Sequence, residues 1–264
     1  MLQQAIDFRD ESEALHGLLD GIDETGFERA TQFKQWTVND VLVHLHFWNR
    51  AADMSVFDPD GFAALFAELG ASLSSGTLRA FENGKIGERG RQLLFAWRAF
   101  YLDMAARWEE LDPGKRVKWA GPEMSVRSSA TARQMETWAH GQEVFDLFGV
   151  ERQDTDRIRN IVVLGVNTYE WGFKVRGMTA PQPMPFVRLT APSGAEWRFG
   201  EDNSESEVSG SAVGFARVVT QTRNVADTDI ETKGEAAALW MANAQCFAGP
   251  PETPPAPGER APAK

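Results

Sequence analysis

The chain has 264 residues, enough for one large domain or two small ones, with 27 lysines and arginines against 38 acidic residues and a net charge of −11. This balance argues against a reader of duplex nucleic acid and against binding to anionic membranes, since both need a basic surface. Cys246 is the only cysteine, so the chain forms no internal disulfide and no thiolate metal cluster.

The N-terminal part of the chain predicts helices. Apolar residues recur at helical spacing over residues 3–20, and a second helix begins at a capping box formed by Thr37 and Asp40. Residues 55–87 are polar and marked by glycine, so their structure is ambiguous, with one candidate helix at 59–73.

Two more long helices follow. One covers residues 88–111 and ends at an Asp-Pro-Gly breaker, and the other starts at Ser128 or Ser129 and ends at Gly149. Four long helices with these spacings predict an up-down bundle, a fold whose core commonly holds metals or ligands.

The composition changes near residue 150, and the remainder predicts a small α+β domain. Helices are expected at 154–173, 212–220 and 235–247. Alternating stretches that predict antiparallel strands lie at 186–190, 196–199 and 205–209, and residues 230–232 are a further candidate strand. The proline-rich end predicts disorder. We therefore expect a bundle over 1–152, an α+β domain over 153–248 and a disordered tail over 249–264.

Targeting signals are not evident in the sequence. The first residues lack the basic and apolar regions of a signal peptide, and the most apolar run, residues 161–166, is far shorter than the ~18 residues of a membrane span. These features predict a cytoplasmic protein with no membrane or nucleic-acid partner.

Histidine spacing indicates a candidate metal site. Glu136 and His140 lie four residues apart, so they share one helix face, and zinc accepts both ligand types. Asp40 and His44 have the same spacing, but Asp40 is already explained as the capping-box acid. Apolar neighbours place His44, rather than His46, toward the bundle core. Spacing alone supports two interpretations equally: an open metal site at His44, Glu136 and His140, or a hydrogen-bonded pair in the core.

Other side chains near these positions are candidates for substrate binding or catalysis. Trp48 and Trp119 could form an apolar pocket wall, Arg127 and Arg133 could bind a carboxylate, and Glu143 could orient a ligand or act as a base. Each has an ordinary alternative: a core tryptophan, a surface arginine or a solvated glutamate.

Two motifs resemble those of a known family. Residues 36–45, Trp-Thr-Val-Asn-Asp-Val-Leu-Val-His-Leu, and residues 136–144, Glu-Thr-Trp-Ala-His-Gly-Gln-Glu-Val, resemble the DinB-like bundles, and most closely the mycothiol-dependent maleylpyruvate isomerase N-terminal domain. Residues 117–149 resemble a subfamily of bundles described only as metal-binding. Residues 207–211 and 225–229 resemble the sterol-carrier-like domain attached to such bundles. Glu143 departs from the aspartate that is frequent in the family.

The resemblance implies a zinc or other divalent metal at His44, Glu136 and His140, and an enzyme that activates a low-molecular-weight thiol for isomerisation or transfer on a small carboxylate-bearing substrate. Two alternatives remain open: a hydrolase or lyase that activates metal-bound water, and a non-catalytic, metal-stabilised module that binds an acyl or lipid ligand. The sequence does not indicate the oligomeric state.

Overall fold

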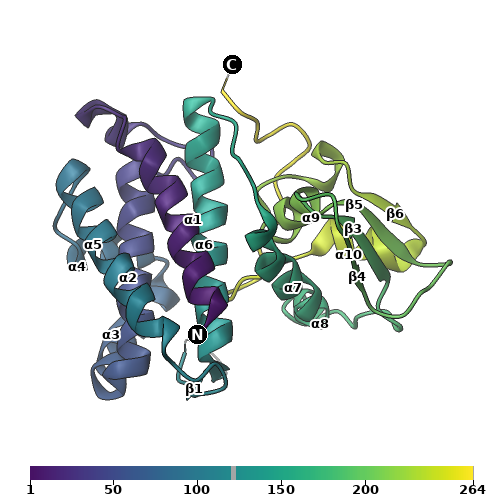
Figure 1. Ribbon diagram of the computed structural model, residues 1–264, viewed down its shortest axis with the longest axis horizontal. Helices are drawn as coiled ribbons and strands as arrows, with labels where there is room; N and C mark the ends of the chain where they lie inside the picture. The colour runs from purple at the N-terminus through teal and green to yellow at the C-terminus, as the bar shows by residue number, and fades with distance from the viewer. Residues whose placement is uncertain (120–122, 264) are drawn as a thin grey trace. The chain divides into compact units, whose positions relative to one another are not determined.

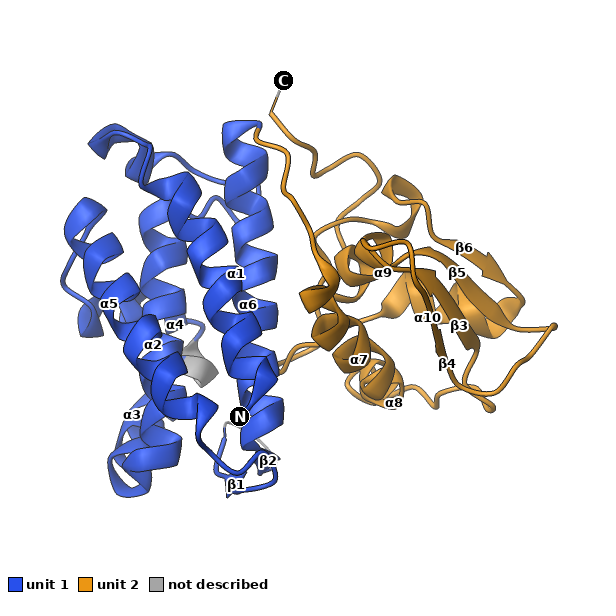
Figure 2. Ribbon diagram, in the orientation of Figure 1, with its two compact units in different colours: residues 1–149 blue, residues 150–264 orange. Residues whose placement is uncertain are grey.

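The computed structural model describes residues 1–119 and 123–263, and the chain divides into two compact units, Met1–Gly149 and a second that begins at Val150 (Figures 1 and 2). Unit 1 is mainly helical, whereas unit 2 combines helices with a four-stranded sheet, which confirms the expected α+β class. Among the described residues, no helix is both long enough and apolar enough to cross a membrane.

Unit 1 is a bundle of four long helices with additions at its edges. α1 packs against α5 and α6, and α2 packs against the same two helices. Trp97, Trp108 and Trp138 are each at most 1% exposed, so large aromatic side chains fill the core. The elements are α1 (Gln3–Leu19), η1 (Glu24–Glu28), α2 (Val38–Phe57), α3 (Pro59–Ser75), α4 (Leu78–Lys85), α5 (Gly90–Glu109), β1 (Arg116–Val117), β2 (Met124–Ser125) and α6 (Val126–Phe148).

The predicted start of α2 is confirmed, whereas that of α6 is wrong. Thr37 accepts a hydrogen bond from the Asp40 amide at 3.1 Å, and the Asp40 carboxylate accepts one from the Thr37 amide at 2.9 Å. In α6 the cap is Ser125, which accepts from the Ser128 amide, so the helix begins three or four residues before the predicted positions. The amide of Val126 is bonded to Lys115, which fixes the helix start beside the short β1–β2 pair.

The ambiguous stretch after α2 contains two helices. The candidate at 59–73 is confirmed as α3, and Gly76 ends it in the left-handed conformation that glycine favours, with φ of 71°. The second helix, α4, was not predicted. It packs against α2 and α3, which places its only buried residue, Glu82, against α2.

Unit 2 holds a sheet in the order β4-β3-β5-β6. Its elements are η2 (Asp156–Ile158), α7 (Arg159–Asn167), α8 (Tyr169–Lys174), β3 (Phe186–Thr190), β4 (Glu196–Phe199), β5 (Glu207–Ser211), α9 (Ala212–Val219), η3 (Val225–Asp227), β6 (Glu231–Lys233) and α10 (Glu235–Asn243). The expectation that all strands are antiparallel is wrong, because β3 and β5 are parallel. β4 returns the chain to the end of the sheet where β3 begins, and β5 starts from that same end, opposite Phe186, so it runs parallel to β3.

Local hydrogen bonds explain the other differences in unit 2. The single helix expected at 154–173 is divided at Thr168, whose hydroxyl donates to the carbonyl of Leu164 at 2.8 Å. Residues 249–263, which we expected to be disordered, carry no helix or strand but are hydrogen-bonded to the rest of unit 2, as when Asn224 donates to the carbonyl of Pro255 at 2.8 Å. Cys246 follows α10, is 4% exposed, and donates its amide to the Val219 carbonyl.

Candidate metal centre

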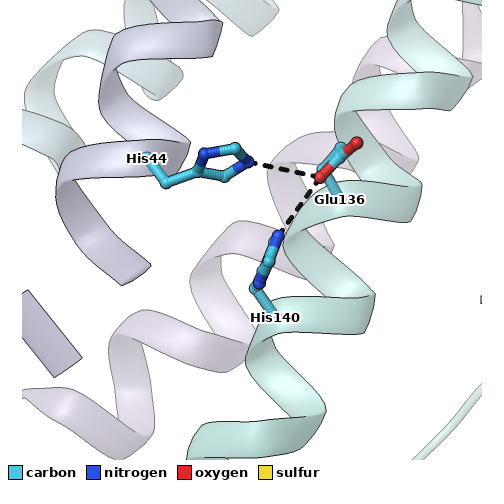
Figure 3. Close-up of side chains that lie close together, drawn as sticks. All are labelled: His44, Glu136 and His140. Atoms are coloured by element: carbon cyan, nitrogen blue, oxygen red, sulfur yellow. Dashed lines mark ion pairs between the residues drawn. The ribbon is translucent and has the colours of Figure 1, made fainter. Parts of the chain in front are cut away.

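Three side chains from two helices of the bundle point toward one another (Figure 3). His44 lies on α2, and Glu136 and His140 lie one turn apart on α6. The Oε2 atom of Glu136 lies 3.5 Å from Nε2 of His44 and 3.3 Å from Nε2 of His140. One ligand atom from each residue lies within 4.8 Å of the others. The structure therefore brings together the three residues that the sequence singled out.

Helix phase separates the two histidines of α2. His46 is rotated to the other side of the helix, where its ring packs edge-on against Phe100 of α5 at 5.5 Å between centroids. His44 instead lies 4.8 Å from His140 between ring centroids. The Glu136–His140 pair meets on α6 because residues four apart share a helix face.

The donor set and its spacing fit a divalent metal. Zinc lies about 2.0–2.2 Å from histidine nitrogen and carboxylate oxygen, so two such ligands at a tetrahedral angle are about 3.3 Å apart. The two separations from Glu136 Oε2, 3.5 and 3.3 Å, are close to that value, and all three ligand atoms lie within 4.8 Å of one another.

A carboxylate on α4 contacts the outer side of His44. The Oε1 atom of Glu82 lies 3.0 Å from His44 Nδ1, and it also accepts a hydrogen bond from Trp48 Nε1 at 2.7 Å. Glu82 is only 1% exposed. Sequence reasoning missed this residue because it lies in the polar stretch that we left ambiguous. The signal that could have identified it is the helical spacing of Leu78, Phe81 and Glu82, which gives the short helix a buried face.

Aromatic rings enclose the two histidines. Trp36 stacks on His140 with centroids 5.4 Å apart and lies 5.2 Å from His44, and Phe33 packs edge-on against His140 at 5.2 Å. Two residues in the left-handed region, Lys34 and Gln35, with φ of 50° and 57°, form the turn that presents Trp36. Such conformations are costly for residues other than glycine, and the turn is closed by a hydrogen bond from the Thr31 amide to the Trp36 carbonyl at 2.7 Å.

The charged groups strongly influence each other's protonation. Burial alone would lower the pKa of His44, but Glu82 and Glu136 outweigh it and raise that pKa to about 9. Burial also acts to raise the pKa of Glu136, yet its two histidine neighbours hold it well below its ordinary value. The pKa of His140 is lowered, mainly by burial. Glu136 is thus ionised, and a cation that replaces the Nε2 proton of His44 lies beside the Glu136 carboxylate.

The predicted substrate-binding residues fall into two groups. Trp48 and Trp119 pack together with centroids 5.6 Å apart, and the Arg133 guanidinium lies 5.5 Å above the Trp119 ring. Arg133 is 4% exposed, and burial lowers its pKa even though Glu136 and Glu82 attract its charge. Arg127, in contrast, is exposed on the first turn of α6.

Two further features adjoin these residues. Glu143 is 2% exposed and continues the face of α6 that carries Glu136 and His140. An open hollow of about 460 Å³ lies beside Trp119, and it is lined by Phe62, Ala63, Phe66, Ala67, Lys118, Trp119 and Glu123. Trp119 is shared between this hollow and the contacts with Trp48 and Arg133.

Comparisons with known proteins agree with this architecture. Residues 8–145 match the family model of the mycothiol maleylpyruvate isomerase N-terminal domain. Two uncharacterized proteins from two strains of Mycobacterium tuberculosis are each 36% identical over 245 residues, which cover 93% of this chain and 95% of theirs.

Solved structures are similar in fold. The crystal structure of the mycothiol-dependent maleylpyruvate isomerase superposes with a TM-score of 0.56 at 15% identity, covering 88% of this chain and 93% of that one. A histidine-to-alanine mutant of the same enzyme gives a TM-score of 0.56 at 16% identity, with the same coverage.

Proposed function

This chain belongs to the mycothiol maleylpyruvate isomerase family, and we propose that it is a divalent-metal enzyme that uses a small thiol to isomerise, or transfer a group to, a small carboxylate-bearing substrate. Zinc is the metal that the ligand set favours, because two histidines and one carboxylate are a common catalytic zinc set. The family supports the thiol, since its name and that of the solved neighbour both refer to mycothiol.

The observation that carries the proposal is the convergence of His44, Glu136 and His140 within 4.8 Å. Three protein ligands leave a position open, as catalytic zinc sites do, whereas structural sites are usually closed by a fourth ligand. A bound divalent cation would supply the positive charge that favours the thiolate form of a coordinated thiol at neutral pH. The chain's own thiol, Cys246, is buried in unit 2, so the reactive thiol would come from a separate molecule.

The surrounding residues have distinct roles in this proposal. Arg133 binds the substrate carboxylate, because a guanidinium can donate two parallel hydrogen bonds to it. Trp48 and Trp119 form the apolar wall that limits access of water. Glu143 is the proposed proton acceptor on α6, since it is buried and continues the ligand face.

Metal content tests the site directly. We expect the purified protein to hold about one divalent ion per chain and to lose it on His140→Ala, because two ligands bind zinc far more weakly than three. His46→Ala is the matched control, since His46 lies on the opposite side of α2 and contacts Phe100. Full occupancy in the His140→Ala protein, measured by elemental analysis, would refute the ligand assignment.

Experiments on the cobalt-substituted protein distinguish the thiol-dependent function from its alternatives. We expect added mycothiol to produce a sulfur-to-metal charge-transfer band and to support isomerisation of a maleyl-type substrate. A loaded protein without that band, but with hydrolytic or lyase activity, would favour a metal-bound water as the nucleophile. Acyl-ligand binding without any turnover would instead favour a non-catalytic module.

A further inference from the structure

Glu82 is the one buried residue of α4, a helix of eight residues whose other members are partly or fully exposed. A carboxylate that is 1% exposed is costly unless donors compensate for its lost hydration. Two donors do so here, and both approach the same oxygen, Oε1: the Nδ1 side of His44 at 3.0 Å and the indole Nε1 of Trp48 at 2.7 Å.

This contact favours the His44 tautomer that carries its proton on Nδ1. Nδ1 of a neutral His44 ring can donate its proton to Glu82 Oε1, which lies 3.0 Å away. Nε2 then keeps its lone pair, and Nε2 is the atom that lies 3.5 Å from Glu136. Ligand histidines are commonly fixed in this way by a carboxylate on the far nitrogen.

The indole of Trp48 fixes the carboxylate itself. Trp48 lies one turn after His44 on α2, so both donors come from one rigid element and meet Glu82 from adjacent positions. The same tryptophan contacts Trp119 at 5.6 Å between centroids, which links Glu82 to the apolar wall as well as to the ligand histidine.

We propose that Glu82 is a positioning residue of the metal centre: it holds His44 in the tautomer whose Nε2 binds the cation and thereby raises the affinity of the site. The proposal rests on the metal-binding function proposed above. It assigns to α4 a role other than covering the bundle, because a residue with only a packing role would not need a buried carboxylate with two donors on one oxygen.

Two substitutions and one control test this role. Glu82→Gln keeps an oxygen acceptor but removes the charge, whereas Glu82→Leu removes both. Glu68→Gln is the control, since Glu68 is an exposed carboxylate of α3 that pairs with Lys85. Competition with a chelator should show zinc affinity about tenfold weaker in Glu82→Gln and about a hundredfold weaker in Glu82→Leu, with Glu68→Gln unchanged.

A spectroscopic readout separates positioning from folding. In zinc-loaded, ¹⁵N-histidine-labelled protein, we expect a protected Nδ1–H signal of His44 in the wild type and its loss in Glu82→Leu. Affinities within about twofold of the wild type in both variants, or a persistent Nδ1–H signal in Glu82→Leu, would overturn the proposal. If Glu82→Leu does not fold, an unchanged zinc affinity in Glu82→Gln overturns it alone. Failure of the wild type to bind zinc would instead refute the proposed function.

Discussion

Arg133 should be the residue whose removal weakens ligand binding without weakening the fold. Its guanidinium is 4% exposed, and within residues 1–119 and 123–263 its Nε and Nη1 atoms have no hydrogen-bond acceptor. Buried donors without an acceptor gain the most binding free energy from an anionic ligand, because burial has already removed their hydrating water. The change we consider is Arg133→Met, which keeps a long unbranched chain against Trp119.

The expected magnitude follows from these contacts. Hydrogen bonds to charged groups contribute about 1.5–3 kcal/mol, so loss of the guanidinium should weaken carboxylate binding by about tenfold to a hundredfold. Stability should not fall in parallel. Burial lowers the pKa of Arg133 despite the attraction of Glu136 and Glu82, so the charged form is disfavoured in the folded chain. Both carboxylates also keep their histidine neighbours.

Calorimetric titration of zinc-loaded protein with maleate, a small dicarboxylate, measures the binding effect, and thermal unfolding of the metal-free protein measures stability. Arg127→Met is the matched control, because Arg127 is exposed on the same helix and should change neither quantity. Unchanged maleate affinity in Arg133→Met would refute the reasoning, as would a loss of Tm large enough to account for the weaker binding.

Two further predictions concern the folding of each unit. Burial, with a smaller contribution from Arg50, lowers the pKa of His46 to about 4, so between pH 6.5 and 4 the unfolded state binds a proton that the folded state excludes. The free energy of unfolding of unit 1 should therefore fall by up to about 3 kcal/mol on acidification through that window. In the His46→Leu protein this free energy, measured by urea unfolding at each pH, should depend less on pH. In unit 2, a β-carbon at Gly165 would lie 2.9 Å from Phe215 and from Val219. Gly165→Ala should therefore lower the free energy of unfolding, measured with denaturant, by about 1–3 kcal/mol. An unaltered midpoint would contradict the packing of α7 on α9.

Local patterns made much of the bundle and its site predictable. The capping box of α2 needs only two side chains three residues apart, and the Glu136–His140 pair needs only helical spacing. His44 followed from the helix phase of its apolar neighbours. Each of these features depends only on residues within one or two turns of a single helix.

What the sequence did not reveal depends on contacts between distant segments. Glu82 contacts the candidate site only because α4 packs on α2. That packing brings Glu82 within 3.0 Å of His44, which is 38 positions away in the sequence. The start of α6 was misplaced because Ser125 and Ser128 are equally good caps, and the β1–β2 pairing decides between them. The parallel β3–β5 pair likewise follows from where β4 ends rather than from residue type.

Cys246 provides a built-in chemical reporter. It is the only cysteine of the chain and is 4% exposed, and thiol reagents react with accessible thiolates. In a solution of the folded protein, the rapid phase of the reaction with such a reagent therefore measures only the small thiol that has been added. Consumption of that thiol can then be followed without a background signal from the protein. Slow labelling of Cys246, in turn, measures how often unit 2 opens.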